Sequence, residues 1–264
     1  MRLAIVGAGA MGGALLRGWL AAGTDPAEVL VVEPDEGRAR TLVDELGVRI
    51  GSLADAGSAG TVVVAVKPKQ VEAVLRELTP APGTVVVSIA AGVTLARLED
   101  AVPDGTPVVR VMPNVGALVG EAMSGVIAGR HVTDEQLRHA QTLLDAVGRT
   151  MVVDEDQLDA LTAVSGSGPA YLFHVADALV EAGVHQGLTR DQATTLAVQT
   201  FVGAAQLLDR SGRTPHELRE QVTSPAGTTA AALRVLDERG VRAAVLAAAE
   251  ACAERSAEMG RQRP

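Results

Sequence analysis

The glycine-rich segment near the amino terminus constrains the fold of this chain more than any other feature. Gly7-Ala8-Gly9-Ala10-Met11-Gly12 follows a short aliphatic run, Leu3–Val6, and leads directly into a helical pattern. In such a turn the first glycine permits a sharp bend, the second lets the backbone approach a pyrophosphate, and the third lets the helix pack close to the sheet. The segment therefore predicts a dinucleotide-binding turn. A glycine-rich strand-to-helix turn without a ligand is the alternative.

Up to about residue 153, short β-branched runs alternate with helical stretches. This alternation is typical of a parallel sheet covered by helices, and runs that are apolar throughout are typical of strands buried on both faces. We expect an α/β fold with an N-terminal Rossmann-type, doubly wound parallel sheet. The expected strands are Leu3–Val6, Val29–Val32, Thr61–Val66, Thr84–Ile89, Val108–Met112, Gly125–Ala128 and Met151–Val153, and the expected helices are Met11–Ala22, Gly37–Leu46, Lys69–Leu78 and Thr133–Val147.

Beyond Asp154 the pattern changes to alanine- and leucine-rich stretches with a 3.6-residue period. Pro169, Thr189 and Thr214 lie at expected helix starts, and Gly183 and Gly187 are expected to interrupt helices. We therefore predict two domains. Residues 1–154 form the dinucleotide-binding domain, and residues 155–264 form an all-α domain.

Composition excludes several classes of function. Aromatic residues make up 2% of the chain and the net charge is −9, so stacking on nucleobases and attraction to nucleic acid or anionic membranes are not expected. No apolar run reaches the roughly 18 residues of a membrane span. Cys252 is the sole cysteine, which favours a reducing, cytoplasmic location. The five histidines show no metal-ligand spacing, so we expect no metal. With nucleic acid and membranes disfavoured, we expect a small-molecule ligand.

The end of the second expected strand bears on the choice of cofactor. Glu33 follows Gly12 by 21 residues, where an acidic side chain accepts hydrogen bonds from the adenosine ribose hydroxyls. This favours NADH. Arg38 and Arg40 are close enough in sequence to pair with the 2′-phosphate of NADPH, so both NADH and NADPH stay open.

Two further segments follow later strands of the expected sheet, at the edge where open α/β sheets bind ligands. Ala65-Val66-Lys67-Pro68 follows one strand, and Ala90-Ala91-Gly92 follows the next. Their small residues allow a nicotinamide and its ribose to lie against the backbone. Lys67 is either a cation beside the cofactor phosphates or a solvated helix start.

Two motifs in the helical half combine glycine with hydroxyl groups. The segment Ser165-Gly166-Ser167-Gly168-Pro169-Ala170-Tyr171 interrupts one helical stretch and restarts another. The segment Ser224-Pro225-Ala226-Gly227-Thr228-Thr229 leads three hydroxyl groups and free N–H groups into a helix start. Such a helix terminus favours a small anion, for example a carboxylate.

Taken together, these segments resemble the pyrroline-5-carboxylate reductase family over nearly the whole chain. The resemblance also includes Arg110-Val111-Met112-Pro113-Asn114, and it departs from the family pattern at Ala10, where the family usually has Asn, and at Gly116, where Pro is common. It implies hydride transfer from NADPH or NADH to the C=N bond of 1-pyrroline-5-carboxylate, the last step of proline biosynthesis. It implies a homodimer through the helical domain, in some cases a decamer, with each active site shared between two protomers.

The resemblance also assigns roles to residues. Ser224, Gly227 and Thr228 would hold the substrate carboxylate, and Thr229, the expected catalytic residue, would reach the ring nitrogen. Glu155 is a possible minor substrate contact or a solvated turn. The cofactor-binding residues would be Gly7 to Gly12, Glu33, Ala65 to Pro68, Ala90 to Gly92, and Asn114.

Three other functions stay open. A β-hydroxyacid dehydrogenase has a similar layout but depends on a lysine in its helical domain, whereas Lys67 and Lys69 are the only lysines here. A reductase of a related cyclic imine fits the same motifs. A dinucleotide-binding regulator without catalysis would not need the second anion site around Gly227.

Overall fold

The structure, a computed structural model, describes residues 3–261 and divides them into two compact units. Residues 3–167 and 252–261 form the sheet unit, and residues 168–251 form the helical unit. The boundary that the sequence predicts after residue 154 marks the change from strands to helices, and the last described strand ends at Val152. Among the described residues, no helix is long and apolar enough to cross a membrane.

The sheet unit is built on one sheet with the strand order β3-β2-β1-β4-β5-β6-β7-β8. All seven predicted strands are present, with ends shifted by up to three residues. The sequence missed β3, because two exposed residues leave no pattern of burial. The strands are β1 Leu3–Val6, β2 Val29–Val32, β3 Arg49–Ile50, β4 Thr61–Val64, β5 Val85–Ser88, β6 Val108–Met112, β7 Ala122–Ala128 and β8 Gly148–Val152.

One strand reverses the direction of the sheet, which makes it mostly rather than entirely parallel. Strands β1 to β6 pair in parallel, β7 is antiparallel to β6, and β8 is parallel to β7. Only residues 113–121, with a short 3₁₀ helix η2 (Val115–Val119), connect β6 to β7. A parallel return needs a crossover of a dozen residues or more, so this connection forces the reversal.

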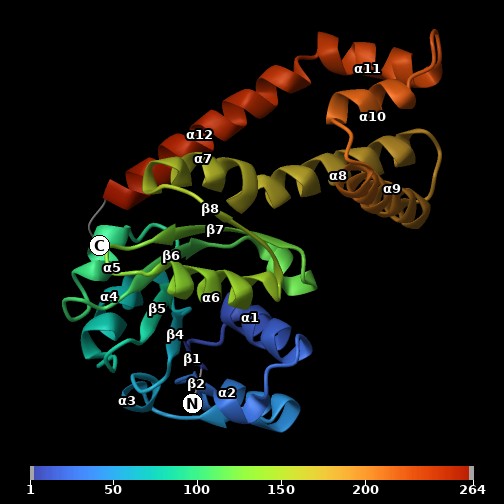
Figure 1. The fold of residues 1–264 in the computed structure, drawn as a ribbon. Coiled ribbons are helices and arrows are strands. Elements are labelled where there is room, and N and C mark those ends of the chain that lie inside the picture. The colour runs from blue at the N-terminus through green and yellow to red at the C-terminus, as the bar shows by residue number, and fades with distance from the viewer. Residues whose placement is uncertain (1–2, 262–264) are drawn as a thin grey trace. The chain divides into compact units, whose positions relative to one another are not determined.

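Helices cover both faces of the sheet, as Figure 1 shows. On one face, side chains of α1 (Ala10–Ala21), α2 (Glu36–Leu46) and α6 (Asp134–Asp145) form a core with the strands. On the other face, α3 (Leu53–Ala56), α4 (Pro68–Glu77) and α5 (Leu95–Glu99) form a second core. The predicted doubly wound arrangement is therefore confirmed.

The first core is fixed by a large aromatic side chain in a chain that has few. Trp19 of α1 is 1% exposed, and its indole N–H donates to the carbonyl oxygen of Leu143 in α6 at 2.7 Å. The sequence pattern also locates the start of α6, where Thr133 and Gln136 form the predicted capping box.

One remaining element, a short 3₁₀ helix, lies between α1 and β2, and the others follow the last strand. Next to the sheet lie η1 (Pro26–Glu28), η3 (Glu155–Gln157), α7 (Leu158–Leu161) and a π-helical turn, η4 (Thr162–Gly166). The helical unit contains α8 (Gly168–His185), α9 (Arg190–Ser211), α10 (Pro215–Gln221), α11 (Thr228–Glu238) and the first part of α12 (Val241–Arg261). Thr189 and Thr214 cap α9 and α10, as predicted.

The prediction that Gly183 interrupts a helix is wrong. Gly183 lies inside α8, and a Cβ atom there would lie 2.9 Å from the Cβ of Ala193 in α9. Glycine at this position therefore permits close packing of α8 on α9, where Val180, Ala193 and Ala197 form a small core. Gly187, with a φ of 96°, follows the end of α8 as expected.

The helical unit leaves many large apolar side chains exposed within this single chain. Phe173 is 67% exposed and Leu246 is 70% exposed, and further exposed residues include Leu172, Val175, Leu179, Leu196, Val198, Val202, Leu207, Leu208, Val235, Leu236 and Val245. Monomeric proteins rarely expose so much contiguous apolar surface, so this unit has the character of an association surface.

Candidate active site

The predicted cofactor segments lie at one edge of the sheet. Residues 7–12 follow β1, residues 65–68 follow β4, residues 90–92 come shortly after β5, and Asn114 follows β6 closely. These four strands are neighbours and run in parallel. Their carboxyl ends therefore meet at the same edge, which is where open α/β sheets bind ligands.

The glycine turn after β1 has the geometry that a pyrophosphate requires. Gly7 has a φ of 90°, and a Cβ on Gly12 would lie 2.2 Å from the carbonyl oxygen of Gly7. Gly9 precedes the first turn of α1, no side chain caps this helix start, and no heavy atom lies within 4 Å of the place where its Cβ would be. The N–H groups at the start of α1 are thus open to an anion.

Glu33, directly after β2, is an enclosed carboxylate. Its side chain is 3% exposed, Oε2 accepts a hydrogen bond from the N–H of Ala8 at 2.9 Å, and Oε1 accepts one from the N–H of Asp35 at 3.0 Å. The guanidinium of Arg38 lies 3.0 Å from Oε2. Burial acts to raise the pKa of Glu33, but these hydrogen bonds outweigh it and lower the pKa below its ordinary value of 4.5.

The segments after β4 and β5 bring backbone close to the glycine turn. A Cβ on Gly7 would lie 3.0 Å from the carbonyl oxygen of Ala65, so the turn packs against the end of β4. Lys67 is exposed and precedes Pro68, the first residue of α4. Gly92, with a φ of 74°, ends the segment that begins at Ala90. Backbone and small residues therefore make up much of this edge.

Asn114 connects three segments through its side-chain amide. Nδ2 lies 3.1 Å from the carbonyl oxygen and 3.2 Å from the hydroxyl oxygen of Ser165, and Oδ1 accepts from the N–H groups of Gly116 and Met123. The residue therefore ties the end of β6 to the π-helical turn. Its predicted contact with the cofactor stays a prediction.

Glu155 is engaged within the sheet unit. Its Oε1 accepts hydrogen bonds from the N–H of Leu95, at the start of α5, and from the guanidinium of Arg110 on β6. The Arg110 side chain is 7% exposed, and this burial lowers its pKa despite the opposing effect of Glu155. The sequence did not predict this ion pair. It left Glu155 as either a minor substrate contact or part of a solvated turn.

The Ser224–Thr229 loop, in the helical unit, forms an open helix start. Gly227 precedes the first residue of α11, Thr228, and no side chain caps this terminus. A Cβ on Gly227 would lie 2.3 Å from the hydroxyl oxygen of Ser224, so a larger residue at this position would displace that hydroxyl. Ala226 has a φ of 58°, which is unusual for a residue other than glycine. Together these features expose N–H groups and hydroxyls to a small anion.

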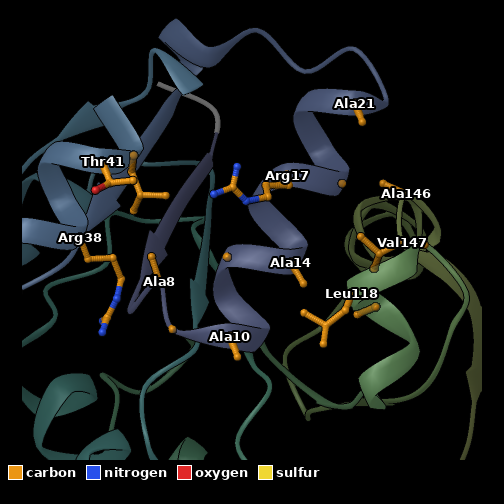
Figure 2. A pocket seen from close by; sticks show the side chains of 16 residues that line it. Ala8, Ala10, Ala14, Arg17, Ala21, Arg38, Thr41, Leu118, Ala146 and Val147 are labelled. Carbon is orange, nitrogen blue, oxygen red and sulfur yellow. The ribbon is translucent and has the colours of Figure 1, made fainter. Parts of the chain in front are cut away.

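A groove of about 560 Å³ runs along α1, as Figure 2 shows. Small residues of α1 line it, with Arg38 and Thr41 on one side and Leu118, Ala146 and Val147 on the other. One end reaches Ala8 and Gly9. The groove thus adjoins the glycine turn, and Arg38 lies at that end. Within residues 3–261, no group of three or more potential metal ligands gathers.

Comparison with protein families matches both halves of the chain. Residues 155–259 match the pyrroline-5-carboxylate reductase dimerisation family, and residues 2–92 match the family described as NADP oxidoreductase coenzyme F420-dependent. Pyrroline-5-carboxylate reductase of Corynebacterium melassecola is 46% identical over 98% of both chains. That of Methanosarcina acetivorans is 40% identical over 99% of this chain and 98% of its own.

Solved structures agree with these matches. A pyrroline-5-carboxylate reductase from Coxiella burnetii has a TM-score of 0.94 at 32% identity and covers 99% of both chains. The Plasmodium falciparum pyrroline carboxylate reductase, solved with NADP bound, has a TM-score of 0.86 at 28% identity and covers 98% of both chains. The chain therefore belongs to the pyrroline-5-carboxylate reductase family of NAD(P)-dependent oxidoreductases, and its helical half carries that family's dimerisation domain.

Proposed function

We propose that this protein reduces the C=N bond of 1-pyrroline-5-carboxylate to L-proline, with the sheet edge holding the nicotinamide cofactor and the Ser224–Thr229 loop holding the substrate. The observation that carries the substrate assignment is the open start of α11, where Gly227 leaves the first N–H groups uncapped beside the Ser224 hydroxyl. A carboxylate satisfies these donors and gains from the helix dipole.

The residues at the sheet edge fit a dinucleotide. Gly7, Gly9 and Gly12 leave room for a pyrophosphate at the uncapped start of α1. Ala8, Ala10 and Met11 complete this turn, and Glu33 supports it from β2 through the N–H of Ala8. We assign the nicotinamide side to the remaining predicted residues of the edge, Ala65, Val66, Lys67, Pro68, Ala90, Ala91, Gly92 and Asn114.

The loop in the helical unit supplies orientation. The backbone N–H groups of Thr228 and Thr229, together with the Ser224 hydroxyl, hold the carboxylate and thereby fix the ring. The N–H of Gly227 donates to the carbonyl oxygen of Ser224 at 3.0 Å, so Gly227 contributes to the shape of the loop. The Thr229 hydroxyl hydrogen-bonds the ring nitrogen. Holding the ring in one orientation and stabilising charge by fixed dipoles are the main sources of rate in such a site.

Reduction adds one hydride and one proton to the substrate. The reduced nicotinamide, when bound, supplies the hydride to the imine carbon. The C=N π bond breaks, and the nitrogen keeps the electron pair as an amine. A cyclic imine that arrives protonated already carries the required proton, so the loop needs no strong general acid, and Ser224–Thr229 contains no His, Lys or Cys.

A direct assay tests this proposal. Purified protein is mixed with 1-pyrroline-5-carboxylate and either NADH or NADPH, and cofactor absorbance and proline formation are followed. We expect cofactor oxidation and proline in equal amounts. The six-membered homologue serves as a second substrate, and faster reduction of that imine than of 1-pyrroline-5-carboxylate would contradict the proposal.

We further propose that the dimers assemble into a decamer and that the protein acts in the cytoplasm. The exposed apolar surface of the helical unit supports association, and the single cysteine supports a reducing compartment. Light scattering coupled to size exclusion measures the assembly, and cell fractionation measures the location.

A further inference from the structure

We propose that Glu155 is a positioning residue, whose carboxylate ties the segment after β5 to β6 and so holds the nicotinamide in the orientation that hydride transfer needs. This inference rests on the proposed function, in which residues 90–92 lie on the nicotinamide side of the cofactor. It differs from the expectation at the sequence level, in which Glu155 contacts the substrate or belongs to a solvated turn.

The segment between β5 and α5 has no regular secondary structure. Residues 89–94 form neither helix nor strand, and Gly92 within them has a φ of 74°. A segment of this kind depends on contacts with other elements for its position. Leu95, the first residue of α5, follows Gly92 by three residues. A contact at the N–H of Leu95 therefore sets where the segment ends.

The carboxylate of Glu155 makes this contact and a second one to the sheet. Its Oε1 accepts a hydrogen bond from the N–H of Leu95 at 2.9 Å, and the same oxygen accepts one from the guanidinium of Arg110. Arg110 lies on β6 beside Ser88, the last residue of β5, and its side chain is 7% exposed. One carboxylate oxygen thus joins the end of the segment to a buried, fixed point on the neighbouring strand.

The last turn of α12 also contacts the segment, but through apolar atoms. A Cβ on Gly92 would lie 3.5 Å from Cε and 3.8 Å from Cβ of Met259, which is ordinary van der Waals contact. Such contacts have no preferred direction, whereas a hydrogen bond weakens steeply when it is bent. The bond from Leu95 to Glu155 is therefore the contact that orients the end of the segment.

Glu155 acts on the main chain of this segment and not on the substrate. Its charge is matched by Arg110, and Oε1 already has two donors. The proposed substrate carries a carboxylate of its own, which the carboxylate of Glu155 would repel at short distance. Loss of Glu155 should therefore disturb the orientation of the nicotinamide while binding of the imine stays intact.

The test separates positioning from stability. Glu155→Ala removes both contacts, and the double variant with Arg110→Met also removes the buried cation that would otherwise lack a partner. The double variant should regain stability but not the hold on Leu95. Asp156→Ala, at an exposed position of the same turn, is the matched control. Calorimetric titration measures the Kd of NADP+ and of adenosine 2′,5′-bisphosphate, which lacks the nicotinamide. Steady-state kinetics measure kcat and KM for the imine, and melting temperatures report folding.

We expect Glu155→Ala and the double variant to lower kcat by roughly 10- to 100-fold, the effect of a misplaced reacting group. The Kd of NADP+ should rise roughly fivefold, whereas the Kd of the bisphosphate and KM for the imine should change less than about twofold. Glu155→Gln keeps an oxygen for the N–H of Leu95 and should recover part of kcat.

Full kcat in the double variant would overturn the inference, because the role of Glu155 would then be stability alone. A raised KM for the imine with unchanged kcat would also overturn it, since that result indicates a substrate contact. Equal weakening of both nucleotides would do the same. If the wild type bound both nucleotides but did not reduce the imine, the proposed function would fail, and the two Kd values would still decide the inference.

Discussion

The side-chain amide of Asn114 donates to the carbonyl oxygen of Ser165 at 3.1 Å, which joins two segments 51 residues apart. The oxygen of this side-chain amide accepts hydrogen bonds from the backbone N–H groups of Gly116 and Met123. Asn114→Ala removes these contacts, and we expect it to lower the free energy of unfolding by about 2–3 kcal/mol, at roughly 1 kcal/mol per hydrogen bond. Urea unfolding measures the loss. Asn114→Asp keeps the two acceptor contacts but sets a carboxylate oxygen against the Ser165 carbonyl oxygen, so it should also lower the stability. Wild-type stability of either variant would contradict this account.

The ion pair of Arg110 and Glu155 supplies a second prediction. Glu155→Ala leaves the Arg110 guanidinium buried without its carboxylate, a change that costs about 3–5 kcal/mol for a fully buried pair. Because the Glu155 side chain is 36% exposed, water replaces part of the contact, and we expect a loss of about 1–3 kcal/mol. Asp156→Ala, one residue away and exposed, is the control. Adding Arg110→Met to Glu155→Ala should restore stability.

Thr229 carries the most direct prediction for catalysis. A hydrogen bond to a charged group is worth about 1.5–3 kcal/mol, so Thr229→Ala should lower kcat/KM by roughly 10- to 100-fold. Thr229→Ser keeps the hydroxyl and should recover most of the rate. An unchanged kcat/KM in Thr229→Ala would remove this residue from the mechanism.

Substitutions at the neighbouring positions Ala226 and Gly227 should have different effects on the loop. Ala226 has a φ of 58°, so Ala226→Gly relieves backbone strain and should leave stability within about 1 kcal/mol of the wild type. Gly227→Ala places a Cβ 2.3 Å from the Ser224 hydroxyl, so Ser224 must move and kcat/KM should fall. Melting temperatures and kinetics of both variants check this pair, and full activity of Gly227→Ala would rule out a tight loop.

The lowered pKa of Glu33 predicts a dependence of stability on pH. A carboxyl group whose pKa is lower in the folded state stabilises the fold above its unfolded pKa, and this contribution disappears as the pH falls through the folded pKa. The melting temperature of Glu33→Gln should therefore lie below that of the wild type at pH 7. The difference should shrink as the pH falls below 4.5. Glu36→Gln, at an exposed position of the same turn, should show a smaller difference at pH 7.

Much of the fold could be predicted from local patterns. Strands such as Val29–Val32 are buried on both faces and therefore apolar throughout, and caps such as Thr133 mark helix starts. The motifs around Gly7 and Gly227 also predicted the family correctly. Gly7 has a positive φ that favours glycine, and Gly227 leaves room for the Ser224 hydroxyl. These signals depend on neighbours in sequence.

The missed features depend on residues that are distant in sequence. Arg110 and Glu155 are 45 residues apart. Nothing in the sequence around either residue indicates that their two charges are paired. Gly183 has the local appearance of a helix breaker, but the contact that explains it comes from Ala193 on the next helix. The direction of β7 follows from the length of the preceding connection, which the strand pattern alone does not reveal.

The return of residues 252–261 to the sheet unit has a consequence for synthesis of the protein. Residues 168–251 behave as an insertion with both ends anchored in one compact body. During translation the sheet and its glycine turn can form early, but this body lacks the helical turns of residues 252–261 until that segment leaves the ribosome. Emergence of this segment, rather than emergence of the sheet, therefore sets the moment at which the cofactor-binding half is complete.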